Sequence, residues 1–513
     1  MREKYSIINS LVGVIVQLAC IIMSFVARTF FIKYLGQYYL GINGLFSNIL
    51  TVLSLSELGF GTAILFNMYK AVSEHDNYQI KCLLTFYAKV YHILACVIFV
   101  IGIFFAIILP YIIRDNPYEI NYVRKIFLLV LINTVVSYIG SYRGSIIYVN
   151  QKNFLIKIVN GLTQVLCVLT QILFLILTKD YVIYLIVQIL FTMLNNLLIY
   201  LMAKKLYPEI YINKSYKLGL DTLRNIKEKV LSLFVHKISA TITNGTDNII
   251  LSRFVGLIAV GQYSNYNMII SSVQTMVDLI IEGTAASMGN LMVEENSEKV
   301  FDIYKIIELI SFCITCFVSV SLLTLLSPFI ELWLGDDFLL SQNIVFVLVL
   351  NFYIIGLRKA VLITRNAGGL YDKDKVAAVV KPVLNLFSSV MGAYYYGTLG
   401  IFVGTFVSSF FADVIIIPYK LYHIYFNKSY LQYIKRYCKY FMVTISAYFF
   451  TELSAHICTL FILNNIIIFA IKIGLCMVIS FLLIFIFFHK NQEFQYIMEL
   501  IKGGMKKIHH PRN

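Results

Sequence analysis

The sequence predicts an all-α polytopic membrane protein, and three observations support this prediction. The first is composition: 59% of the 513 residues are hydrophobic and 13% are charged, which leaves too little polar surface to cover a soluble globule. The second is a series of apolar runs of about 20 residues, each long enough to cross a hydrocarbon core about 30 Å thick. The third is an internal repeat, because one membrane unit occurs twice in the chain.

The apolar runs predict about fourteen transmembrane helices. The first group lies near residues 8–30, 42–66, 84–112, 126–149, 155–178 and 181–202. The second group lies near residues 237–256, 259–292, 306–334, 341–364, 377–397, 399–421, 439–460 and 464–488. The first run is longer than the apolar core of a signal peptide, about 7–15 residues, so we expect it to be retained as a span.

Glycines at a constant offset mark the repeat. Gly36-x4-Gly41 returns as Gly256-x4-Gly261, 220 residues later. Further matches keep nearly the same offset across about 80 positions, which indicates a duplicated unit. We therefore expect two pseudo-symmetric six-helix lobes, followed by two C-terminal helices without a counterpart.

Loop lengths and charge set the expected domains and orientation. The predicted domains are an N-terminal six-helix lobe (1–202), a cytoplasmic loop with an interfacial helix (203–236), a C-terminal six-helix lobe (237–422), two additional transmembrane helices (423–490) and a basic cytoplasmic tail (491–513). The formal net charge is +15, and the basic residues fall on alternate loops and the tail. Because basic loops favour the cytoplasmic side, we expect both termini in the cytoplasm and no nucleic-acid partner.

Polar residues follow one face of the run 259–292. They are Asn267, Ser271, Gln274, Asp278 and Glu282, at helical spacing. The run 42–66 carries a related stripe that ends in Glu57. Polar side chains inside a membrane are costly and commonly functional, so we expect Asn267 and Gln274 to bind substrate and the carboxylates of Glu57, Asp278 and Glu282 to couple an ion. The alternative is that the stripes hydrogen-bond neighbouring helices.

Cations and a polar helix complete the expected binding site. The predicted substrate-binding residues are Arg28, Arg143, Lys237, Asn244, Asp247, Asn267, Gln274 and Arg358. The run 237–256 is too polar to face lipid, and the arginine fork of donors matches phosphate oxygens. The site therefore suits an amphiphilic anion. The alternative for Arg28 and Arg358 is a structural ion pair with Glu57, Asp278 or Asp247.

Motifs for chemical catalysis are lacking in the sequence. It contains no G-x-x-x-x-G-K-[ST] phosphate loop and no Gly-rich dinucleotide fingerprint. The cysteines lie singly in apolar segments, where cysteine usually packs as a small hydrophobe. We expect no enzyme activity, no cofactor and no metal site, with energy supplied by H⁺ or Na⁺ coupling, the membrane potential or downhill movement of substrate.

Several motifs resemble the bacterial polysaccharide-transporter family of oligosaccharide-lipid flippases. They are Arg28-x5-Tyr34-Leu35-Gly36-x4-Gly41, Leu53-Ser54-Leu55-Ser56-Glu57-Leu58-Gly59-Phe60-Gly61 and Thr246-Asp247-Asn248-Ile249-Ile250. This family belongs to a superfamily that also includes multidrug and toxin extruders and lipid II flippases. The Arg-x-x-Gly and Asp-Ala-Phe pattern expected early in lipid II flippases is absent.

The resemblance implies translocation of undecaprenyl-diphosphate-linked oligosaccharide repeat units across the bacterial cell membrane, for capsule or a similar polymer. It implies alternating access of two lobes around a cationic cavity, with Arg28, Lys237 and Arg358 facing the diphosphate or acidic sugars. The two C-terminal helices would form a groove for the polyprenyl tail. Expected partners are the lipid-linked oligosaccharide, membrane lipids, a polysaccharide polymerase and glycosyltransferases. The alternatives are an ion-coupled multidrug or cation extruder of the same superfamily and a non-transporting membrane scaffold.

Overall fold

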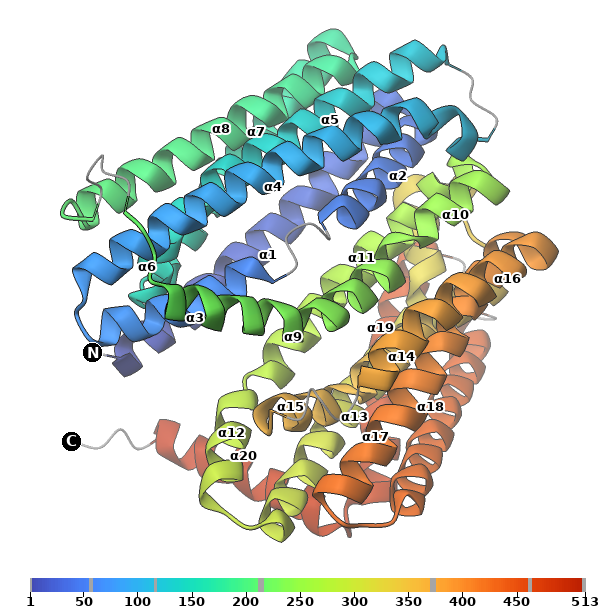
Figure 1. Ribbon diagram of the computed structural model, residues 1–513. Helices are drawn as coiled ribbons and strands as arrows, with labels where there is room; N and C mark the ends of the chain where they lie inside the picture. Colours follow the sequence, from blue (N-terminus) through green and yellow to red (C-terminus); the bar gives the residue numbers. More distant parts are fainter. Residues whose placement is uncertain are drawn as a thin grey trace. The chain divides into compact units, whose positions relative to one another are not determined.

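Helices form all the regular structure in the described part of the chain (Figure 1). The computed structural model describes residues 2–509 apart from 55–58, 115–117, 211–215, 370–374 and 460–463. Ten helices within these ranges are long and apolar enough to cross a membrane. The predicted all-α polytopic membrane class is confirmed.

The chain divides into two compact units, Met1–Gly261 (unit 1) and Gln262–Asn513 (unit 2). The helices of unit 1 are α1 (Arg2–Leu35), α2 (Gln37–Leu53), α3 (Phe60–Ser73), α4 (Asn77–Ile112), α5 (Ile120–Ser141), η2 (Tyr142–Gly144), α6 (Ser145–Val149), α7 (Asn153–Thr178), α8 (Tyr181–Leu206), α9 (Leu220–Gly245) and α10 (Asp247–Phe254). The next helix, α11 (Leu257–Glu282), crosses the boundary between the units. The domain boundaries expected from the sequence stay a prediction.

Apolar side chains on neighbouring helices fill the core of unit 1. Ile42 and Phe46 of α2, Ile98 of α4 and Phe127 of α5 are fully buried. The rings of Phe46 and Phe127 meet edge to face, with centroids 5.0 Å apart. Because lipid tails are as apolar as these side chains, close packing between helices is what holds a membrane core together.

The repeated glycines occupy equivalent places at the starts of α2 and α11. Gly36 and Gly256 precede these helices with φ of 83° and 131°, a backbone conformation that glycine adopts without steric cost. A Cβ on Gly41 would lie 2.0 Å from the carbonyl oxygen of Leu257, and one on Gly261 would lie 2.7 Å from that of Gln37. The second glycine of each motif therefore lets the first turns of α2 and α11 pack against each other.

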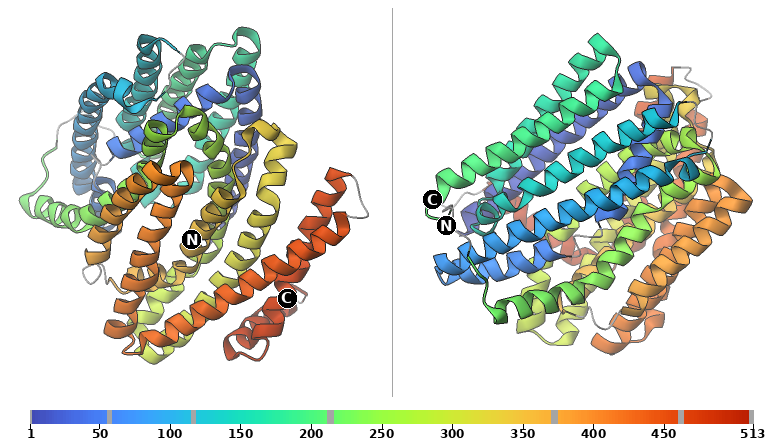
Figure 2. Two further views of the ribbon diagram at one scale, coloured as in Figure 1. Left: turned by 90° about the vertical axis from the view of Figure 1, so that its right-hand side faces the viewer. Right: turned by 45° about the horizontal axis from the view of Figure 1, so that its top comes forward.

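Unit 2 is arranged around one long helix. Its helices after α11 are α12 (Ala285–Glu294), α13 (Ser297–Leu334), η3 (Asp336–Phe338), α14 (Gln342–Leu357), α15 (Lys359–Ala367), α16 (Lys375–Ser409), η5 (Phe410–Ile416), α17 (Ile417–Lys420), η6 (Leu421–Tyr425), α18 (Tyr430–Thr459), α19 (Asn465–Phe488) and α20 (Gln492–His509). Helix α13 packs against α14, α18 and α19, and the last two run side by side (Figure 2). This packing explains the burial of Phe312, Cys316 and Val320 on α13.

The predicted count of fourteen spans is not confirmed. The run 42–66 is divided between α2 and α3, and α3 begins after Gly59, which is in the left-handed conformation. The runs 377–397 and 399–421 belong to one continuous helical stretch, kinked at Gly397, where φ is 56°. The runs 237–256 and 259–292 are not among the ten candidate spans, because their many polar residues lower the mean hydropathy.

Candidate functional site

Arg28 lies on α1 close to a cluster of aromatic rings in unit 1. Its neighbours include Tyr181 and Tyr184 of α8. One turn along α1, Phe31 contacts both tyrosine rings edge to face, with centroids 5.5 and 5.4 Å away. Tyr39 of α2 packs on Tyr181 from the other side, with centroids 5.2 Å apart. Arg28 is thus a half-buried cation beside tyrosine rings and hydroxyls, which suit a sugar or an anion.

Arg143 lies in the short 3₁₀ segment η2, where the helical path of α5 changes. Its guanidinium lies over the rings of Tyr142 and Tyr200, 5.7 and 4.7 Å from their centroids. A ring face attracts a cation through its quadrupole and leaves the formal charge intact. The sequence identified Arg28 and Arg143, but it did not identify Tyr181, Tyr184 and Tyr200 beside them, because these tyrosines come from α8, which is distant in the sequence.

The polar segment of α9 and α10 hydrogen-bonds to α2 within unit 1. Asn248 Nδ2 donates to the carbonyl of Gly44 and to Asn48 Oδ1, at 3.1 Å each. Asp247 is buried in the first turn of α10, where a helix N-terminus favours a carboxylate. Lys237 is exposed on α9, and Asn244 lies on the same helix. Part of the polarity of this segment therefore joins α10 to α2.

The polar stripe of α11 meets a lysine of α15 in unit 2. Gln274 Nε2 donates to Asp278 Oδ1 at 2.6 Å. Lys359 Nζ lies 2.9 Å from Asp278 Oδ2 and 3.1 Å from Glu282 Oε1. Asn267 is exposed farther along the stripe. The structure thus brings together Gln274, Asp278 and Glu282, and it adds Lys359 to them; Glu57 lies outside the described residues.

Arg358 belongs to a buried charge cluster, which we call the Asp413 triad: Arg358, Lys381 and Asp413. Both cations hydrogen-bond the same carboxylate oxygen, Asp413 Oδ2. Asp413 is 2% exposed and lies in the π-helical segment η5, while Lys381 lies on α16. The partner of Arg358 is therefore Asp413, which none of the sequence-based alternatives named. Asp413 could have been noticed in the sequence, because it is the single carboxylate of the apolar run 399–421.

A second buried ion pair joins α13 to α18. Arg436 Nη2 lies 2.9 Å from Glu308 Oε2, and the hydroxyl of Tyr304 donates to Glu308 Oε1 at 2.8 Å. Arg436 also hydrogen-bonds the hydroxyl of Tyr422. Glu308 is fully buried, and a buried charge needs such partners to offset its desolvation. The sequence analysis did not single out Glu308.

In the described part of the chain, no three His, Cys, Asp or Glu residues are grouped closely enough to hold a metal ion. The roles in substrate binding and ion coupling that the sequence predicts for these residues stay predictions. Arg28 and Arg143 lie in unit 1, and Gln274, Asp278, Glu282 and Arg358 lie in unit 2.

Solved structures share this fold. The chain matches the lipid II flippase MurJ in its inward closed conformation, with a TM-score of 0.70 and 16% identity, over 93% of this chain and 99% of that one. It also matches an inward-facing multidrug resistance MATE family transporter of the MOP superfamily, with a TM-score of 0.62 and 13% identity, over 80% and 97% of the chains. A third match is the Vibrio cholerae MATE transporter VcmN in its bent form, with a TM-score of 0.56 and 13% identity, over 83% and 98%.

Family membership follows from a different comparison. No curated protein sequence matches the chain. A family model described as "Polysaccharide biosynthesis protein" matches residues 6–286, which is more than half of the sequence. The chain therefore belongs to the polysaccharide biosynthesis protein family.

Proposed function

We propose that the protein is a flippase that moves undecaprenyl-diphosphate-linked oligosaccharide repeat units from the inner to the outer leaflet for cell-surface polysaccharide synthesis. The observation that carries the proposal is the family match over residues 6–286, which includes Arg28 and Arg143 in membrane helices. Ionisable residues within membrane segments are rare, and they commonly line substrate paths. The shared fold with a lipid II flippase supports the same function.

Each proposed residue has a role that its chemistry suits. Arg28 and Arg143 attract the diphosphate or acidic sugars, and the tyrosines beside them pack on sugar rings. Asn244, Asp247, Lys237 and Asn267 supply hydrogen bonds along the hydrated path. Gln274 is proposed to bind substrate from the edge of the ion-coupling group, because its amide also donates to Asp278.

Coupling is proposed to occur at Asp278 and Glu282, with Glu57 as a third candidate. Lys359 forms ion pairs with the first two carboxylates, so that one positive charge faces two negative charges. A proton or Na⁺ that took the place of Lys359 would change the local charge, and a change of charge at a helix contact can bias two conformations of a transporter. Alternating access of the two lobes would use this bias.

Translocation by purified protein in liposomes tests the proposal. The substrate is a fluorescent polyprenyl-diphosphate oligosaccharide, and the readout is the fraction that becomes accessible to a membrane-impermeant quencher. Arg28→Ala should lose activity, while Lys33→Ala, an exposed cation on the same helix, is the matched control. Failure of the unaltered protein to translocate this lipid, together with normal surface polymer in a deletion strain, would overturn the proposal.

The alternative function is an ion-coupled extruder of drugs or cations, which the match to a multidrug MATE transporter favours. Dye efflux that depends on the protein, with an unchanged cell surface after deletion, would support it. Orientation is a separate part of the proposal: both termini lie in the cytoplasm of the bacterial cell. A C-terminal reporter fusion that is active only in the cytoplasm would report this.

A further inference from the structure

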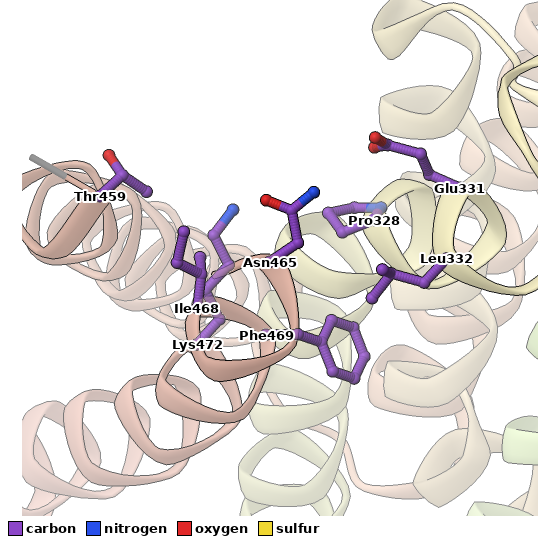
Figure 3. Close-up of a pocket in the computed structure, with 8 residues that line it drawn as sticks. All are labelled: Pro328, Glu331, Leu332, Thr459, Asn465, Ile468, Phe469 and Lys472. Atoms are coloured by element: carbon purple, nitrogen blue, oxygen red, sulfur yellow. The ribbon is translucent and has the colours of Figure 1, made fainter. Parts of the chain in front are cut away.

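We propose that unit 2 binds a membrane lipid with a zwitterionic amine–phosphate headgroup, such as phosphatidylethanolamine, in a polar pocket between α13, α18 and α19. The pocket consists of two adjoining cavities of about 200 and about 420 Å³ that share Lys472 and Thr459 in their walls. Figure 3 shows the first cavity, with Glu331 on one side and Asn465 and Lys472 on the other. The second cavity adds Glu452 and His456 of α18.

Lys472 is the feature that distinguishes this pocket from ordinary membrane packing. It is the single charged residue of the 24-residue helix α19, and it lies seven residues after Asn465, about 10 Å along the helix axis. Figure 3 shows its side chain reaching back toward the first turn of α19, where Asn465 lies. A lysine at this depth places its ammonium near the headgroup layer while its stem stays in apolar surroundings.

An aromatic side chain places the pocket near the membrane interface. Trp333, the one tryptophan of the chain, follows the pocket residues Glu331 and Leu332 on α13. Its ring packs on Phe329, with centroids 5.6 Å apart, and Phe329 in turn contacts Phe469 of the pocket. Tryptophan is enriched where headgroups meet the hydrocarbon core. The basic residues at the start of α18 and the end of α19 lie at the opposite ends of these helices.

The charges in the pocket select the class of ligand. None of Lys472, Glu331 and Glu452 makes a salt bridge with another residue among those described. Lys472 nevertheless lines one cavity together with Glu331 and the other together with Glu452. A purely anionic headgroup would meet the two carboxylates, and a purely cationic one would meet the lysine. A headgroup that carries a phosphate and a primary ammonium group satisfies both, through charge-assisted hydrogen bonds to Lys472 and to the glutamates.

The surroundings of the pocket also suit a lipid tail. Around Glu452 and His456, α18 exposes Phe449, Leu453 and Ile457, and beyond Lys472 α19 exposes Ile473 and Met477. Acyl chains can lie along these apolar surfaces while the headgroup occupies the polar pocket. The proposal is independent of the flippase function, because it concerns a lipid that stays bound at the surface of unit 2.

Quenching of Trp333 fluorescence tests the proposal directly, since no other tryptophan contributes. The full-length protein is reconstituted in liposomes that contain equal mole fractions of lipids brominated in the acyl chain: phosphatidylethanolamine, phosphatidylcholine or phosphatidylglycerol. Phosphatidylcholine has the same charges without N–H donors, and phosphatidylglycerol lacks the ammonium. We expect the ethanolamine lipid to associate about fivefold more strongly than either of the others.

Variants identify the residues that recognise the headgroup. Lys472→Met should abolish the preference, Lys472→Arg should keep it, and the double change Glu331→Gln with Glu452→Gln should shift it toward phosphatidylglycerol. Lys435→Met, an exposed lysine of α18 away from the pocket, is the matched control and should leave the preference unchanged. The arginine variant keeps the test valid if the methionine variant does not fold.

Soluble phosphoethanolamine distinguishes a headgroup site from a whole-lipid site. Relief of quenching by an excess of this compound would show that the headgroup alone is recognised. Selective quenching that persists in its presence would assign the site to the complete lipid. Equal quenching by the three lipids, or a preference that Lys472→Met leaves intact, would overturn the proposal.

Discussion

The two units hold their buried cations with different kinds of partner. In unit 1, the guanidinium of Arg143 lies over the rings of Tyr142 and Tyr200, and Arg28 lies beside Tyr181 and Tyr184. In unit 2, carboxylates bind the cations: Asp413 binds Arg358 and Lys381, Asp278 and Glu282 bind Lys359, and Glu308 binds Arg436. Arg436 also lies over the rings of Phe301 and Tyr304. A tyrosine ring stabilises a cation without cancelling its charge, whereas a carboxylate neutralises it.

This difference suggests a division of roles between the units. Arg28 and Arg143 lie beside tyrosine rings, a setting that suits recognition of a sugar ring and a diphosphate. Carboxylate partners tie together the helices of unit 2, because breaking a buried ion pair leaves an uncompensated charge. We expect substitutions in unit 1 to change transport more than stability, and substitutions in the buried pairs of unit 2 to change stability first.

The largest expected effect is on the Asp413 triad. Asp413→Ala leaves the charges of Arg358 and Lys381 next to each other without their counterion, and should lower the free energy of unfolding by about 3–5 kcal/mol. The double variant Asp413→Ala with Lys381→Met should recover part of this loss. Chemical denaturation of the purified protein measures both. Asp302→Ala, which removes a carboxylate that is 66% exposed, is the control, and equal losses in the two single variants would contradict the comparison.

Arg28→Ala should have the next largest effect, and it should fall on transport. Loss of charge-assisted hydrogen bonds worth about 2 kcal/mol lowers the rate of translocation by roughly 30-fold. The free energy of unfolding should change by no more than about 1 kcal/mol. A liposome assay and a denaturation curve on the same preparation separate the two quantities. A large loss of stability with unchanged transport per folded molecule would assign Arg28 to the structural role.

Asp278→Asn should alter coupling with a modest effect on stability. The carboxylate is partly exposed, and its pair with Lys359 contributes about 1 kcal/mol or less. If Asp278 binds the coupling ion, the variant should translocate at a rate that no longer depends on pH or on Na⁺. Glu282→Gln, at the more exposed partner of Lys359, should reduce this dependence less. A variant with the full dependence of the unaltered protein would remove Asp278 from the coupling site.

The smallest expected effect is at the surface of unit 1. Lys70 and Glu74 form an exposed pair with N and O atoms 3.9 Å apart, and such pairs contribute about 0.5 kcal/mol or less. Lys70→Met should therefore leave both the unfolding free energy and the translocation rate unchanged. A measurable loss of either would contradict the expectation that exposed cations of unit 1 contribute less than Arg28 and Arg143, which lie beside tyrosine rings.

Local sequence features predicted much of the fold, because membrane helices must satisfy their backbone hydrogen bonds within apolar segments. The run 155–178 became α7 and the run 181–202 became α8 with little change. The breaks were harder to predict, since the turn before α3 and the kink at Gly397 depend on backbone conformations at single glycines. The run 237–256 carried enough polar residues to be recognised as unusual, but not enough information to reveal that Asn248 bonds to α2.

Individual charged residues could be identified from the sequence, and their partners could not. Arg358 was recognised as a cation within a membrane segment, while its carboxylate lies 55 residues away on η5. The sequence analysis offered Glu57, Asp278 or Asp247 as the partner because each lies deep in a membrane segment. Position along a helix gives the depth of a side chain in the membrane, but it does not show which neighbouring helix the side chain faces. Arg143 was likewise recognised, but its contact with Tyr200 of α8 could not be predicted, because helical periodicity relates only residues of the same helix.

The contact at Gly41 and Gly261 has a consequence for how this sequence can change over time. Each of the two glycines lies against backbone of the other repeat, so an alanine at either position would push apart the starts of both helices. The two copies of the motif are bound to each other by geometry as well as by common origin. After a duplication one copy can usually change its sequence, but here neither Gly41 nor Gly261 can be replaced without disturbing the packing of α2 against α11.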